Sequence, residues 1–141
     1  MQSLNISTGV KEYTLKGEDT GEIVIRFNPT DIFFAEKLYN AFTMLDNKQS
    51  EYTNITGMDN KEAFSFCRKV DQEMRNIIDE IFGVPASNAV FGELHSYSMA
   101  GGLPVWMNLE FAVMDEMQDA FTREKKATDP RLKKYIDRYK R

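Results

Sequence analysis

The sequence predicts an α+β protein, mostly α, in which an N-terminal β-hairpin packs on a bundle of four to five helices. Three observations carry this prediction. Apolar and polar residues alternate on both sides of a turn-rich segment within residues 1–28. Apolar residues then recur at three- and four-residue spacing in several stretches. Pro or Gly stands at the ends of those stretches, where helices begin and end.

The predicted hairpin has two strands on either side of residues 17–21, which are rich in turn-forming side chains. The apolar positions of its buried face are Tyr13, Leu15, Ile23, Ile25 and Phe27. A sheet of only two strands is marginal in water, so the hairpin must pack on helices or join the sheet of another chain. Its free edges offer one route to self-association.

The first predicted helix begins at Asn28 as the N-cap, with Pro29 at the first position and Asp31 at the third. Its apolar stripe is Phe34, Leu38, Ala41, Phe42 and Leu45. Residues 47–60 are polar and predict a frayed helix end and a loop. A second helix is expected from residue 59 or 61 to residue 82, ended by Gly83 and Pro85, with the stripe Ala63, Cys67, Val70, Met74, Ile77, Ile78, Ile81 and Phe82.

The second half of the chain predicts further helices. Residues 85–91 favour a short helix closed by Gly92, and residues 93–100 favour another turn or two of helix. Pro104 is expected to start the longest helix, which runs to residue 126. We expect one domain over 1–141: a hairpin over 1–28, a helical core over 29–126 and a basic amphipathic helix over 129–141, with the stripe Leu132, Tyr135, Ile136 and Tyr139.

The composition is that of a globular protein, with 42% apolar and 28% charged residues. A single cysteine, Cys67, rules out an intramolecular disulfide. The first residues lack the blocks of a signal peptide, and no apolar run reaches membrane-spanning length, so we expect a cytoplasmic protein with no membrane contact. Residues 123–141 carry a net charge of +6, whereas the other 122 residues carry −10. A solvated helix that complements an acidic body explains this division better than nucleic-acid binding.

The chain has no recognisable catalytic or cofactor motif. His95 is the only histidine, and its neighbours do not have metal-ligand spacing. The paired carboxylates, such as Asp79 with Glu80, are adjacent on helices and diverge by about 100°. Cys67 lies on an apolar stripe, which favours a small core residue over a nucleophile. We therefore expect no enzyme activity, no metal and no cofactor.

Candidate protein-contact residues lie in two places. The segment around Gly101 and Gly102 contains the only tryptophan and several methionines, residue types that are common at interfaces. Its candidates are Tyr97, Met99, Trp106 and Met107, although for Trp106 and Met107 the pattern favours filling the core of a tight corner between helices over a contact role. The basic terminal helix adds Tyr135, Arg138 and Tyr139.

Five stretches cover nearly the whole chain in order: NISTGVKEYTL, IRFNPTDIFFAEKLYNAF, MRNIIDEIFG, GGLPVWMNLEFAVMDEM and REKKATDPRLKKYIDRYKR. Together they resemble a family of small proteins from phages and prophages of Firmicutes, whose members look like siphophage tail assembly chaperones. Residues 47–60 depart from the charged helical stretch of the family.

This resemblance implies a non-enzymatic chaperone that binds the tape measure protein and helps recruit tail tube subunits. It brings no catalytic residue and no individual binding residue. Self-association, with the acidic body of one copy meeting the basic tail of another, agrees with this role. The alternatives are a virion structural or head–tail completion protein, and a phage inhibitor of a host protein.

Overall fold

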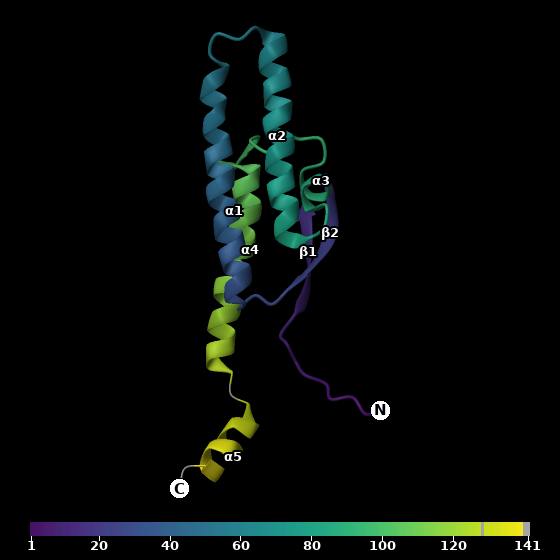
Figure 1. Cartoon of the computed structure of the whole chain (residues 1–141), viewed down its shortest axis with the longest axis vertical. Helices are drawn as coiled ribbons and strands as arrows, with labels where there is room; N and C mark the ends of the chain where they lie inside the picture. The colour runs from purple at the N-terminus through teal and green to yellow at the C-terminus, as the bar shows by residue number, and fades with distance from the viewer. Residues whose placement is uncertain (128, 140–141) are drawn as a thin grey trace.

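The protein is α+β and mostly helical, as the sequence predicts (Figure 1). The computed structural model describes the backbone of residues 1–127 and 129–139, and the side chains of residues 1–127 and 129–134. In chain order the elements are β1 (Lys11–Gly17), β2 (Gly21–Phe27), α1 (Ile32–Ser50), the 3-10 helix η1 (Glu51–Ile55), α2 (Asn60–Phe82), α3 (Ala86–Phe91), β3 (Met99–Ala100), β4 (Leu103–Pro104), α4 (Val105–Lys126) and α5 (Pro130–Tyr139).

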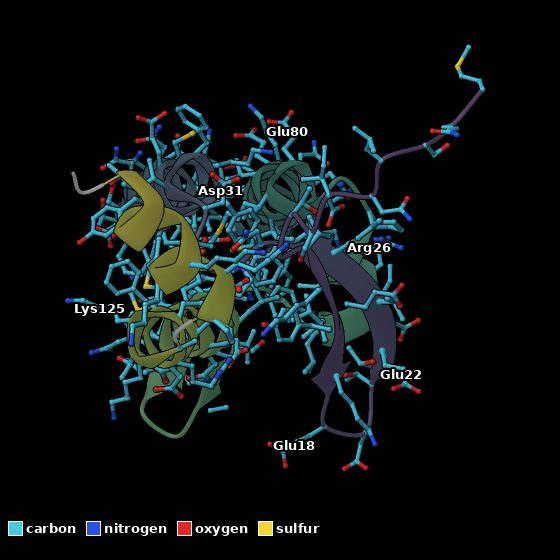
Figure 2. The ribbon with its side chains drawn as sticks, turned by 90° about the horizontal axis from the view of Figure 1, so that it is seen from below. Glu18, Glu22, Arg26, Asp31, Glu80 and Lys125 are labelled. Carbon is cyan, nitrogen blue, oxygen red and sulfur yellow. The ribbon has the colours of Figure 1, made fainter. Side chains whose placement is uncertain are left out.

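The long helices α1 and α2 run antiparallel, and α4 lies beside α1 and extends past its N-terminal end (Figure 1). The hairpin and α3 lie against the C-terminal half of α2. Seen from below, β1 is the strand nearer α4 and β2 is the outer strand (Figure 2). The sheet therefore stands beside the helices with one edge turned toward α4.

The predicted hairpin is confirmed, because β1 and β2 pair antiparallel with Leu15 opposite Ile23. Ile25 and Phe27 are buried, whereas the intervening side chains are exposed, as a period-two pattern requires. The Phe27 ring stacks on Phe34 of α1 with centroids 4.3 Å apart. The hairpin is thus anchored to the first helix by stacked aromatic rings.

Two apolar clusters form the core. One joins the hairpin to α1, α2 and α4, and its buried members are Ile25, Phe27, Phe34, Leu38, Ala41, Ile81 and Val113. The other lies toward the C-terminal end of α1, beside the middle of α2. Its buried members are Leu45, Val70, Met74, Ile78, Phe91, Trp106 and Leu109. Most of the residues named on the two predicted helical stripes belong to these clusters.

The turn end of the hairpin packs closely against α3. A Cβ atom on Gly17 would lie 2.0 Å from the carbonyl oxygen of Val90, and the Thr20 hydroxyl donates a hydrogen bond to the same oxygen. Only glycine permits this approach of two backbones. This contact fixes the turn end of the hairpin to α3, the short helix that follows α2.

The predicted start of the first helix is wrong by three residues. Asp31, not Asn28, is the N-cap, and its carboxylate accepts a hydrogen bond from the Phe33 amide. Asn28 instead closes a turn, because its side-chain oxygen accepts a hydrogen bond from the Thr30 amide. Asn and Asp are both favoured as N-cap residues, and Asp31, which directly precedes the helix, is the one that caps it.

The segment 47–60 is more ordered than predicted, since α1 continues to Ser50 and η1 follows. Two long-range contacts hold this region. Lys48 forms an ion pair with Glu73 of α2, and Gln49 accepts a hydrogen bond of 2.8 Å from the Trp106 indole. A polar helix end is thus stabilised by partners that lie far away in the sequence.

The prediction of a helix over 93–100 is also wrong. These residues form turns that lead into a small hairpin, in which Met99–Ala100 pairs with Leu103–Pro104. Gly101 and Gly102 have φ values of 63° and 88°, and a two-residue hairpin turn of type I′ needs positive φ at both positions. Pro104 precedes α4 rather than opening it, and α2, with 23 residues, is one residue longer than α4.

Candidate functional site: exposed apolar surfaces and a buried polar network

Trp106 is a core residue, so its prediction as a protein-contact residue is wrong. Its side chain is 0% exposed and packs edge-on against the Phe42 ring at 5.1 Å. The indole N–H is satisfied by Gln49. A large aromatic side chain next to a helix start is suited both to a contact surface and to a corner of the core. In this protein the side chains around Trp106 bury it.

The other candidates before and within α4 are more accessible. Met107 is half-buried against the second core cluster, and Met99 is 59% exposed. Tyr97 is exposed and contacts the Tyr52 ring at 5.4 Å. The structure thus places Tyr97 in an exposed turn and Met99 at the start of β3, whereas Trp106 is in the core.

The candidates Tyr135, Arg138 and Tyr139 have side chains outside the described residues. The backbone of α5 confirms a helix over Pro130–Tyr139. At its start, Asp129 accepts hydrogen bonds from the Arg131 amide and guanidinium, which lower the pKa of Asp129 to about 2.

An exposed apolar surface that the sequence analysis missed lies on α1. We define the α1 outer face as Ile32, Phe33, Tyr39 and Met44, of which the first three are 77%, 79% and 71% exposed. At 100° per residue these four side chains fall within an arc of about 140°, opposite the buried stripe of the same helix. The printed sequence contained the signal, because these residues interrupt the polar side that an amphipathic surface helix normally has.

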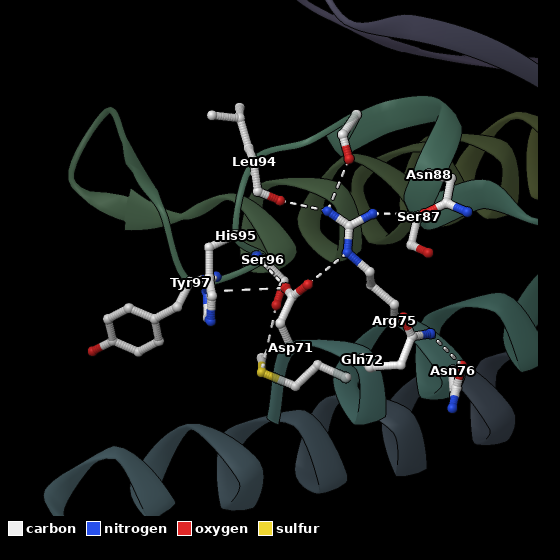
Figure 3. Close-up of polar contacts among 12 residues, drawn as sticks. Asp71, Gln72, Arg75, Asn76, Ser87, Asn88, Leu94, His95, Ser96 and Tyr97 are labelled. Carbon is white, nitrogen blue, oxygen red and sulfur yellow. Dashed lines mark hydrogen bonds and ion pairs between the residues drawn. The ribbon is translucent and has the colours of Figure 1, made fainter. Parts of the chain in front are cut away.

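The loop between α3 and β3 is fastened to α2 by a buried arginine (Figure 3). The Arg75 guanidinium donates to the carboxylate of Asp71 at 2.8 Å, to the Asn88 side chain at 2.8 Å, and to the carbonyl oxygens of Gly92 and Leu94. Burial opposes the ionisation of Asp71, but hydrogen bonds from Ser96 and Arg75 outweigh it and lower the pKa of Asp71. Each charged group is therefore compensated.

His95 belongs to the same network and is half-buried. Its Nδ1 accepts a hydrogen bond of 3.0 Å from the Tyr97 amide, which assigns the ring proton to Nε2 in the neutral form. Nε2 lies 3.1 Å from the Cys67 carbonyl oxygen and 2.7 Å from the Tyr52 hydroxyl. These contacts show that the His95 ring links α2, η1 and the loop before β3.

Glu110 is the one described carboxylate that is buried without a partner. It is 0% exposed, and neither carboxylate oxygen accepts a hydrogen bond in the structure. Burial raises the pKa of Glu110 to about 8. It lies one helical turn after Trp106 and one before Val113, both buried, so it is on the core side of α4.

Glu116, also on α4, is part of a bridge to the hairpin. The Tyr13 hydroxyl donates to its carboxylate at 2.6 Å, and Arg123 donates to the same oxygen at 3.1 Å. Burial and this hydrogen bond raise the pKa of Tyr13 to about 12, and the same bond lowers the pKa of Glu116. Glu116 therefore holds β1 near α4.

A groove of about 460 Å³ lies between β1 and α4. Its volume falls within the range of ligand-binding clefts. The apolar part of its wall is formed by Leu15, Val90, Phe91, Leu94, Val105 and Leu109. Lys16 and Glu18, of opposite charge, line the end near the hairpin turn.

Within the described part of the chain, no three His, Cys, Asp or Glu side chains come close enough together to hold a metal ion. Among the described helices, none has the length and apolar character needed to cross a membrane. The chain matches no family model, no curated protein and no solved structure. The function of the chain is therefore inferred from its exposed apolar surfaces and from the family resemblance.

Proposed function

We propose that this chain is a non-enzymatic phage tail assembly chaperone of the bacterial cytoplasm. In this role it holds an apolar helical segment of the tape measure protein and helps recruit tail tube subunits. The observation that carries the proposal is the α1 outer face, on which three of the four large apolar side chains are more than 70% exposed. Exposed patches of this kind mark binding sites for other proteins.

The geometry suits a helical partner. The four apolar residues lie in two rows along one side of a helix of 19 residues, Ile32 with Tyr39 and Phe33 with Met44, about 120° apart. A partner helix with apolar residues at three- and four-residue spacing is able to pack along such a row. The aromatic residues Phe33 and Tyr39 are the expected anchors, since aromatic side chains carry much of the binding energy at interfaces.

The test is co-purification of the chain with fragments of the tape measure protein. The double variant Phe33→Ser, Tyr39→Ser removes the two aromatic anchors, and we expect affinity to fall about tenfold or more. The matched control, Phe64→Ser with Phe121→Ser, removes two exposed apolar side chains that lie off α1. Circular dichroism checks that each variant retains its helix content.

Equal binding by the two double variants would contradict the role of the α1 outer face. A second measurement addresses the chaperone role itself, because a chaperone leaves the assembled particle. Mass spectrometry of purified virions should then lack this chain. Its presence in mature particles at stoichiometric amounts would favour a virion structural or head–tail completion protein instead.

A further inference from the structure

The segment before β1 is an extended arm with one apolar side. We define the N-terminal arm as residues 4–10, in which Leu4, Ile6, Thr8 and Val10 alternate with Asn5, Ser7 and Gly9. All seven residues are exposed, with Leu4 at 91% and Ile6 at 81%. The arm contains no charged side chain. Alternation of this kind is typical of a strand with one buried face, yet this face is covered by nothing in the described structure.

The base of the arm is fixed where it meets the hairpin. The Asn28 side chain donates a hydrogen bond of 2.7 Å to the Thr8 carbonyl oxygen, and Gly9 has a φ of 72°. From this point the arm runs away from the body, as both views show (Figures 1 and 2). A rooted and extended arm is placed to reach a neighbouring molecule.

The groove between β1 and α4 offers a complementary surface. The described sheet of the hairpin has only two strands, so the edge of β1 that does not face β2 is unpaired by any strand. That edge faces α4 in the view from below, and the groove lies between the two elements (Figure 2). A free strand edge beside an apolar groove is the arrangement that accepts an added strand.

We propose that the N-terminal arm of one copy binds as a third strand along β1 in the groove of a second copy. The arm has seven residues, as β1 does, so the two match in length at about 3.3 Å per residue. Leu4 and Ile6 meet the apolar wall of the groove.

The partner is a second copy because the base of the arm is held away from the groove of its own molecule. The Thr8 carbonyl is bound by Asn28, the residue after β2, whereas the groove is lined by residues 14–18 and 20, near the hairpin turn at the other end of β1. A reciprocal exchange between two copies is a self-complementary contact. Seven arm residues and fourteen groove residues give about twenty-one residues per protomer, which is the size of a stable interface.

The test is sedimentation equilibrium of the full chain and four variants over micromolar concentrations. Leu4→Lys with Ile6→Lys places charges on the apolar side of the arm, and Asn5→Lys with Ser7→Lys adds the same charges to its other side. Ala112→Arg fills the groove from an exposed position of α4, and Gln118→Arg adds the same charge to α4 outside the groove. None of these six positions is buried, so the fold is retained.

We expect a dimer for the wild type and for the two control variants. The apolar-side arm variant and the groove variant should each raise the dissociation constant of the dimer about tenfold or more. A monomeric wild type overturns the proposal. A dimer that resists the arm variant also overturns it, and a dimer sensitive to the arm variant but not to Ala112→Arg excludes the groove as the docking place.

A disulfide experiment separates exchange from docking within one molecule. A chain with Ile6→Cys is mixed with a chain with Ala112→Cys, both in a Cys67→Ser background, so that a disulfide between the two new cysteines joins different molecules. A cross-linked heterodimer supports exchange, and its absence in a mixture that contains dimers contradicts it. This outcome is independent of the tape measure test, because no residue of the α1 outer face is changed.

Discussion

Buried ionisable residues in this protein fall into two classes that the sequence does not distinguish. Arg75 is compensated by a carboxylate, an amide and two carbonyl groups, so its charge remains in the core. Glu110 has no such partners, and burial alone raises its pKa to about 8. The carboxyl is thus held mainly neutral at neutral pH, at a cost in stability when the pH rises.

The first prediction concerns Glu110→Gln. Between about pH 4.5 and pH 8 the native state binds a proton that the unfolded state has lost, so the free energy of unfolding of the wild type falls as the pH rises. Each unit of pKa shift corresponds to about 1.4 kcal/mol, and the full loss is of the order of 3–5 kcal/mol. Glutamine cannot ionise. In urea unfolding, the free energy of unfolding of the variant should therefore rise relative to that of the wild type between pH 5 and pH 8.

The control for this measurement is Glu124→Gln, which changes an exposed carboxylate on the same helix. Its difference from the wild type should be the same at both pH values. If the free energies of unfolding of Glu110→Gln and the wild type change in parallel with pH, the pKa of Glu110 is not raised by folding, which would contradict the prediction.

At the scale of elements, short irregular segments depend on long-range contacts. The loop from Gly92 to Ser96 has no regular structure, yet Arg75 and Asp71 of α2 bind its carbonyl and amide groups. α3 is held in a similar way, because Asp79 accepts a hydrogen bond from the Ser87 amide. Helix α2 is therefore the frame to which the segment before α4 is attached.

The second prediction is that Arg75→Met lowers the free energy of unfolding by about 3–5 kcal/mol, because it leaves Asp71 and two carbonyl oxygens without their buried partner. The matched control is Lys48→Met, which breaks the more exposed ion pair with Glu73 and should cost no more than about 1 kcal/mol. Urea unfolding of both variants measures the difference. If Arg75→Met and Lys48→Met lower the free energy of unfolding equally, the Arg75 network contributes no more to stability than an exposed ion pair does.

At the scale of the whole molecule, two modes of self-association make opposite demands on charge. The acidic body and the basic segment 123–141 attract each other electrostatically. The N-terminal arm, in contrast, has no charged side chain and meets a groove with one charge of each sign. The two modes therefore respond differently to salt.

The third prediction is that the dissociation constant of the dimer changes little, by less than about threefold, between roughly 0.1 and 1 M NaCl. Screening shortens the range of electrostatic attraction from about 10 Å to about 3 Å over this interval, but leaves apolar and backbone contacts in place. Sedimentation at both salt concentrations gives the answer. A dimer that dissociates at high salt would point to contact between body and tail.

The sequence by itself determined the hairpin, the positions of α2, α3 and α4, and most of the core. These features follow from local periodicity and from Gly and Pro at element ends, as at Gly83, which ends α2 in the left-handed conformation. The sequence also determined that α5 is a helix with basic residues. It did not distinguish the N-cap Asp31 from Asn28, because both side chains are capable of the same hydrogen bond.

Only the tertiary structure decided which apolar residues are buried and which are exposed. Trp106 is in the core because Phe42 and Gln49, from a helix more than fifty residues earlier, surround it. Phe33 is exposed although its chemistry is similar, because no element covers that side of α1 in the described structure. Burial depends on what lies opposite a residue in space, and periodicity along one element does not contain that information.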